Sequence, residues 1–349
     1  MNKTPYAIVA ALAALLTFVV ITFGAYVRLS DAGLGCPDWP GCYGRLAVPE
    51  SREAIAEANA AYPQRHVEPA KAWKEMVHRY LATGLGVLIL MLAVAAWYYR
   101  DNGIPVMLPT SLVALVIFQG LLGMWTVTLL VKPLIVTAHL VGGLVTLILL
   151  GWLVLRVGRL FLTPLNPSFV RLRPWIWLGF VLLWLQILLG GWTSTNYAAA
   201  ACVEFPTCFG GMWWPTTDFH EAFTLWRGLG INYEFGVLES PARTAIHLAH
   251  RVGALVVLVY LGVLSVQVMQ RAASRAQVGI GMVLHFLVIA QVGLGIAVVL
   301  HLRQLPVAVA HNGGAALLLL TLVTLIHVLK PPANVAETAT PSTAGGHSA

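Results

Sequence analysis

Charged side chains are scarce in this 349-residue sequence, in which Asp, Glu, Lys and Arg together make up only 10%. A soluble domain has about a quarter of its residues charged, so this composition excludes an ordinary soluble protein. Hydrophobic residues reach 58%, and the mean hydropathy is +0.79. The net charge of +7 does not indicate nucleic-acid binding, because the arginines lie beside apolar segments and form no single basic patch. The sequence predicts a polytopic protein of the lipid bilayer.

Cysteine is also scarce, with four residues in two pairs, Cys36 with Cys42 and Cys202 with Cys208. Five residues separate the members of each pair, whereas paired ligands of structural zinc are usually two to four residues apart. We therefore predict one disulfide in each pair and an oxidising compartment around it, with free thiols as the alternative. A bridge across so short a loop contributes on the order of 2 kcal/mol in the chain-entropy model.

The apolar runs predict an all-α integral membrane fold with eight transmembrane helices. The predicted spans cover residues 6–29, 75–99, 106–130, 134–156, 175–197, 244–269, 277–300 and 306–329. They divide the chain into an N-terminal half (1–157) with a long loop at 30–74, a basic linker (158–174), and a C-terminal half (175–330) with a long loop at 198–243. Ser51–Tyr62 reads as a short amphipathic surface helix, and residues 331–349 as a disordered tail.

The distribution of charge predicts the orientation of the spans. Arg100, Arg271, Arg275 and the linker arginines lie on the side of the termini, whereas 12 of the 14 acids lie at or near the other side. Because basic loops stay in the cytoplasm, we expect cytoplasmic termini and external cysteine loops. This agrees with the predicted disulfides.

Four histidines recur at a fixed spacing. His78 and His139 are 61 residues apart, as are His250 and His311, so that the second pair is the first shifted by 172 positions. The shift of 172 also relates Arg79 with Arg251, Gln119 with Gln291, Gly123 with Gly295, and Gly142 with Gly314. A shift of 166 relates Cys36 with Cys202 and Cys42 with Cys208. The chain is therefore a duplicated unit, which we expect to form two four-helix bundles related by a pseudo-twofold axis along the membrane normal.

Each histidine pair is placed to bind a haem. All four histidines lie in spans that run in the same direction and at similar depth, so the members of a pair can face each other inside a bundle. Imidazole is an axial ligand of haem iron, and Arg79 and Arg251 could neutralise propionates or simply extend to the membrane interface. The alternatives are hydrogen-bonded packing histidines, or zinc, for which His247 is the only candidate third ligand.

Other polar residues in the spans have simpler interpretations. Gln119, Gln186 and Gln291 each precede a glycine by four residues, which predicts close helix packing with an interhelical hydrogen bond. His285, His301 and His327 have no counterpart in the other half, and we expect them to be packing or interfacial residues.

The two halves differ at Glu75, which the shift of 172 aligns with His247. Glu75 lies one helical turn before His78, so both share a helix face. An acid or base beside only one haem is expected if that haem is chemically altered. The alternative is that Glu75 only favours the positive N-terminus of its helix.

These residues resemble those of the haem A synthase family, membrane enzymes that convert haem O to haem A for cytochrome oxidase. The resemblance covers nearly the whole chain and depends on five matches: Gly33–Cys42, Glu75–Arg79, His139, Ala249–Arg251 and His311. It implies a haem b held by His250 and His311, and a substrate haem between His78 and His139 with Glu75 as the acid, base or cation-stabilising group. Cys36–Cys42 and Cys202–Cys208 would be the family's outer-loop pairs.

The implied reaction oxidises the C8 methyl of haem O through an alcohol to the aldehyde. The resemblance also implies a bacterial inner membrane, with haem O synthase, cytochrome oxidase assembly proteins or further copies of the chain as partners. The alternative function is a di-haem, quinol-linked electron-transfer protein. It is less favoured because both pairs lie at one depth, which leaves no route across the membrane.

Overall fold

The computed structural model describes residues 3–161, 166–301 and 304–329, and eight of its helices are long and apolar enough to cross a membrane. No strand occurs in these ranges, which confirms the predicted all-α membrane fold. The long helices are α1 (Lys3–Leu29), α3 (Pro69–Tyr98), α4 (Met107–Thr128), α5 (Pro133–Val157), α7 (Arg173–Thr195), α9 (Ser240–Gln270), α10 (Arg275–Leu300) and α11 (Leu305–Val328). The shorter ones are α2 (Arg52–Ala61), α6 (Pro167–Val170), α8 (Phe219–Ala222) and 3₁₀ turns at Arg100–Asn102 and Ala198–Ala200.

Two helices begin a full turn or more before the starts that the apolar pattern predicts. α3 begins at Pro69 and α9 at Ser240, six and four residues before the expected starts at 75 and 244. Both have proline in the first turn, where its missing N–H and fixed φ suit a helix start. The added turns are polar because they leave the apolar layer, so hydropathy alone does not detect them.

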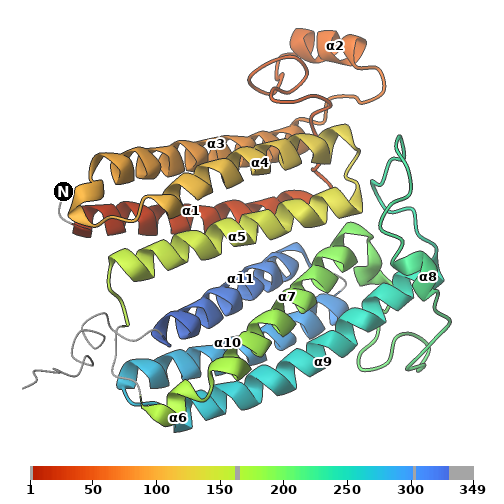
Figure 1. Ribbon diagram of the computed structural model, residues 1–349. Helices are drawn as coiled ribbons and strands as arrows, with labels where there is room; N and C mark the ends of the chain where they lie inside the picture. The colour runs from red at the N-terminus through yellow and green to blue at the C-terminus, as the bar shows by residue number, and fades with distance from the viewer. Residues whose placement is uncertain (1–2, 162–165, 302–303, 330–349) are drawn as a thin grey trace, which may run out of the picture.

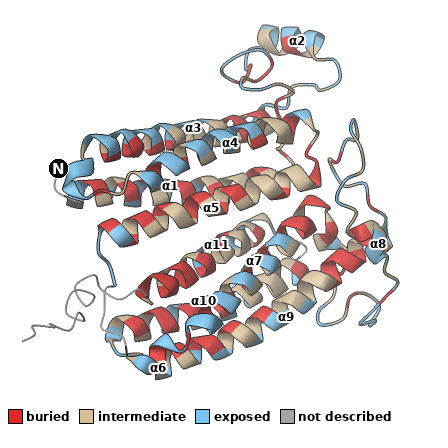
Figure 2. Cartoon of the chain, viewed as in Figure 1, coloured by how far each residue is buried: buried red, intermediate tan, exposed pale blue. Residues whose placement is uncertain are grey.

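The long helices form two groups of four. In the N-terminal half α1 packs on α3 and α5, and α4 packs on α3 and α5; in the C-terminal half α7, α9, α10 and α11 make the corresponding contacts (Figure 1). The halves meet where α1 packs on α11 and where α5 packs on α7 and α11. Buried residues gather on the faces between helices (Figure 2), while large apolar side chains such as Leu90 and Val94 face outward. Such faces suit lipid.

Both long loops lie at the same end of the molecule, away from the N-terminus (Figure 1). The predicted surface helix is present as α2, where Ser51 Oγ accepts a hydrogen bond from the N–H of Ala54 at 3.1 Å. Arg65 of the first loop pairs with Glu234 of the second at 2.7 Å. The predicted tail at 331–349 lies outside the described residues, as do residues 162–165 of the linker.

Candidate functional site

The predicted disulfides are present in both loops. Cys36 is bonded to Cys42 and Cys202 to Cys208, with Cα–Cα distances of 4.8 and 4.3 Å. All four cysteines are buried. In each loop an acid accepts backbone N–H groups: Asp38 from Tyr43 and Gly44, and Glu204 from Gly210 and Gly211.

Arg79 and Arg251 hold these loops to the helices. The Arg79 guanidinium donates to the carbonyls of Asp38, Pro40 and Gly41, and that of Arg251 donates to those of Cys202, Glu204, Pro206 and Thr207. The loop positions correspond between the halves. The structure therefore gives both arginines a loop-binding role that the sequence does not reveal. Their predicted contact with propionates stays a prediction, although Arg251 also lines the cavity described below.

Glu75 and His247 make the same contact in the two halves. The N–H of Cys36 donates to Glu75 Oε2 at 2.9 Å, and the N–H of Cys202 donates to His247 Nδ1 at 3.2 Å. Glu75 also pairs with Arg79 at 2.5 Å and is buried. Both side chains therefore accept a hydrogen bond from the first cysteine of their loop, although one is an acid and the other a histidine. Only Glu75 adds a negative charge.

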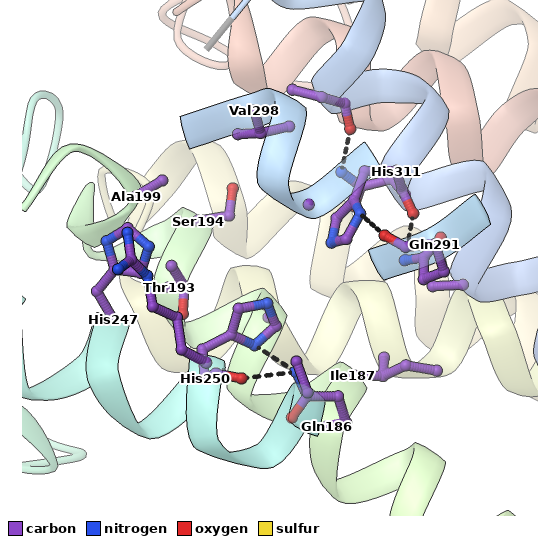
Figure 3. A pocket seen from close by; sticks show the side chains of 18 of the residues that line it. Gln186, Ile187, Thr193, Ser194, Ala199, His247, His250, Gln291, Val298 and His311 are labelled. Atoms are coloured by element: carbon purple, nitrogen blue, oxygen red, sulfur yellow. Dashed lines mark hydrogen bonds between the residues drawn. The ribbon is translucent and has the colours of Figure 1, made fainter. Parts of the chain in front are cut away.

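His250 and His311 face each other across a cavity in the C-terminal half (Figure 3). Their ring centroids are 6.5 Å apart, with the planes at 84°. Two imidazoles that bind one metal from opposite sides, each at about 2 Å, have ring centres roughly 6 Å apart. The cavity has a volume of about 800 Å³ and a largely apolar wall that includes Leu183, Val257 and Val288. This volume falls within the range of small-molecule and cofactor sites, about 300–1,000 Å³.

The ring nitrogens that face away from the cavity are hydrogen-bonded to α7 and α10. His311 Nδ1 lies 3.1 Å from the carbonyl of Gln291, which can only accept, so this nitrogen carries the proton and Nε2 has a free lone pair. His250 Nδ1 lies 2.9 Å from the side-chain amide of Gln186. Both glutamines also donate to a backbone carbonyl across the helix interface, at His250 and His311. The predicted interhelical hydrogen bonds are confirmed for Gln186 and Gln291.

The N-terminal pair has a different environment. His78 lies in α3 beside the ring of Phe23, with centroids 6.5 Å apart, and His139 lies in α5. The Nδ1 atoms of both rings are buried without a hydrogen-bond partner, as is the side-chain nitrogen of Gln119. Among the described residues no three of His, Cys, Asp and Glu form a metal-binding group, so nothing there supports zinc.

Two cationic residues at the cavity were not identified from the sequence. Arg28 of α1 and Arg243 of α9 line it, and Arg28 donates to the carbonyls of Ser194 and Thr195. The repeat gave no signal for Arg28, which the shifts of 166 and 172 align with Ser194 and Ala200, whereas Arg243 aligns with the cationic Lys71 under the shift of 172. Elsewhere His285 bonds to Ser265 at 2.9 Å, and His327 bonds to the carbonyl of Leu160 at 3.1 Å, as expected of packing residues.

The chain is similar to known proteins over most of its length. Residues 7–323 match the model of a family described as cytochrome oxidase assembly protein. A heme A synthase of Shewanella oneidensis is 45% identical over 318 residues, which is 90% of this chain and 93% of the relative. Heme A synthases of Rhizorhabdus wittichii and Halalkalibacterium halodurans are 28% and 26% identical, over 92% and 89% of this chain and 93% and 92% of the relatives. This chain belongs to the cytochrome oxidase assembly protein family.

Proposed function

We propose that this chain is a haem A synthase, an oxidoreductase that converts the C8 methyl of haem O through an alcohol to the formyl group of haem A. The observation that carries the proposal is the apolar cavity crossed by His250 and His311. The similarity to heme A synthases over 90% of the chain supports the same activity.

His250 and His311 are the ligands for a haem b in this cavity. The free lone pair on His311 Nε2 and the spacing of the two rings fit an iron bound between them. Haem b bound there supplies one-electron transfer. Arg28, Arg243 and Arg251 are among the residues that line this cavity, and their positive charge suits the propionates of a porphyrin. Nδ1 of His247 already accepts a hydrogen bond from the N–H of Cys202, which favours His250 as the iron ligand.

His78 and His139 are the ligands for the substrate haem in the N-terminal half. Glu75 lies one turn from His78 and supplies the only carboxylate at this position of the repeat. We assign it the role of stabilising positive charge or moving a proton at the reacting methyl group. Its contacts with Cys36 and Arg79 fix the carboxylate in one position.

The orientation follows from the charge distribution. The proposal places the disulfide loops outside a bacterial inner membrane and the termini in the cytoplasm. Haem O synthase, which makes the substrate, and other cytochrome oxidase assembly proteins are the partners that this role requires.

The test is product formation in a host that makes haem O but no haem A. Membranes with the wild-type chain should yield haem A on extraction, and His78→Ala and His250→Ala should abolish it. Recovery of haem B alone from both sites, with no haem A, would support a di-haem electron-transfer protein instead.

A further inference from the structure

A groove with a volume of about 490 Å³ lies between α3 and α4, the two helices of the N-terminal half farthest from the C-terminal half (Figure 1). Leu90, Trp97 and Ile117 line it and are exposed, so the groove opens on the surface that faces lipid. The one hydroxyl in its wall, on Thr110, accepts from Nε1 of Trp97 at 3.0 Å and donates to the carbonyl of Val106 at 2.8 Å. The rest of the wall is apolar.

Gly86 and Gly120 lie one turn from the groove, on the side of the histidines. Gly86 precedes Leu90 by four residues in α3, and Gly120 follows Ile117 by three in α4, so both share the groove's faces. No atom of another element lies within 4 Å of the place that a Cβ would take at either glycine. Glycines usually let membrane helices pack closely, but these two have no neighbour to pack against. The seam between α3 and α4 is therefore open at this turn.

The C-terminal half has side chains where the N-terminal half has these glycines. The shift of 172 aligns Gly86 with Leu258 of α9 and Gly120 with Val292 of α10. Both of these side chains line the cavity between the histidines of that half. The seam that holds the cavity closed in one half is thus open in the other.

The groove differs from its counterpart in the same way. Ala93 and Val113 line it on opposite helices, and the shift of 172 aligns them with Ser265 and His285. Oγ of Ser265 lies 2.9 Å from Nδ1 of His285, a hydrogen bond that joins α9 to α10 at this level. An apolar pair beside a groove in the N-terminal half is therefore a bonded pair in the C-terminal half.

The two haems of the proposed function differ in shape as the two seams do. Haem O carries a long isoprenoid chain at a position where haem b has a vinyl group, so a closed bundle suits haem b and an open one suits haem O. We propose that the seam between α3 and α4 holds the isoprenoid chain of the substrate haem, which passes between Gly86 and Gly120 into the groove. This inference rests on the proposed function, because that function assigns haem O to the N-terminal half.

The seam acts by giving the chain room. Lipid is as apolar as the groove, so the chain gains little affinity by leaving one for the other. Side chains that fill the seam would instead collide with the chain, and overpacking of this kind is destabilising. Filling should therefore weaken the binding of haem O and leave the binding of haem B unchanged.

The experiment titrates the full-length protein with haem O and, separately, with haem B. The protein is made in a host without haem O and placed in lipid nanodiscs, and binding that His78→Ala removes is assigned to the N-terminal half. Gly86→Leu with Gly120→Val introduces the residues of the C-terminal half and should weaken haem O binding at least tenfold, with haem B binding as in the wild type. The matched control is Gly84→Val. Gly84 also has open space beside it but lies two residues from Gly86, on another face of α3, so both haems should bind as in the wild type.

A second variant keeps the test decisive should the double variant not accumulate. Ala114→Trp fills the groove from an exposed position and should also weaken haem O binding alone. Unchanged haem O binding in the filled variants, or equal weakening of both haems, would overturn the inference. Failure of the proposed function would show separately, as wild-type protein that binds no haem O through His78.

Discussion

Glu75 combines two roles that substitution can separate. Its carboxylate accepts the N–H of Cys36, the contact that His247 makes to Cys202 in the other half. A histidine is therefore a side chain that this architecture already accepts at that position. The carboxylate charge has no equivalent in the C-terminal half.

We predict that Glu75→His keeps the loop attached but reduces haem A formation at least 100-fold, a loss typical of a missing acid–base group. Glu75→Ala should lose both the acceptor and the activity. Haem A formation in membranes and protection of the Cys36 amide from hydrogen exchange measure the two roles. Full activity of Glu75→His would show that the acceptor alone is required.

His250 and His247 are one turn apart, and their substitutions should have different effects. We expect His250→Ala to abolish the haem b spectrum, since it removes an axial ligand. His247→Asn keeps an acceptor for the Cys202 N–H and should retain the spectrum. Optical spectra of the two purified variants show which histidine binds the iron. Loss of haem from His247→Asn alone would identify His247, and not His250, as the ligand.

The histidine pairs were predictable because duplication repeats their spacing of 61 residues. The partners of their Nδ1 atoms were not, since these depend on the rotation of each helix about its axis and on side-chain rotamers. Arg79 and Arg251 illustrate the same limit. Their positions followed from the repeat, but their hydrogen bonds to loop carbonyls depend on how each loop folds back.

Each disulfide loop is stabilised by a carboxylate that accepts hydrogen bonds from the loop backbone, Asp38 in the first loop and Glu204 in the second. The pKa of Glu204 lies below its ordinary value because the N–H of Gly211 donates to the carboxylate, as do the Thr207 hydroxyl and the N–H of Gly210. A lowered pKa means that the charged form stabilises the folded loop. This contribution is complete above the ordinary glutamate pKa and is lost as the pH falls through the lowered pKa.

We therefore predict that the second loop loosens on acidification below about pH 4. Hydrogen exchange at the amides of Gly210 and Gly211, measured between neutral and acid pH and corrected for intrinsic rates, reports the change. Glu204→Gln should show faster exchange at neutral pH and little further change on acidification. The same pH response in wild type and variant would exclude Glu204 as its source.

The sequence predicts where the membrane-spanning helices lie better than it predicts where each helix begins. All eight spans were identified because each needs a long apolar run, and this requirement is set by the bilayer. The polar first turns of α3 and α9 were missed, since they lie beyond the apolar run. Glu75 of α3 and His247 of α9, which hold the loops, follow directly after those turns and lie within the predicted spans.

At the scale of the whole molecule, the ion pair between Arg65 and Glu234 connects the loops of the two halves. Their side chains are 26% and 10% exposed, so solvent screens the pair less than an open surface pair. We predict that Arg65→Glu or Glu234→Arg lowers the thermal stability and that the double swap restores it, with a coupling energy of about 1 kcal/mol.

Arg45 and Glu57 supply the matched control, because this pair lies within one loop and its side chains are 47% and 73% exposed. Swapping them should change the unfolding temperature little. Equal changes in unfolding temperature for the two swaps would show that the ion pair between the halves stabilises the protein no more than an exposed pair within one loop.

The most direct test is to measure which haem each half of the chain binds. The purified chain should yield haem B together with haem O or haem A. Haem B should disappear in His250→Ala and His311→Ala, and the second haem in His78→Ala and His139→Ala. Haem B in both halves, or haem content that none of the four substitutions changes, would contradict the assignment of a resident haem to one half and a substrate haem to the other.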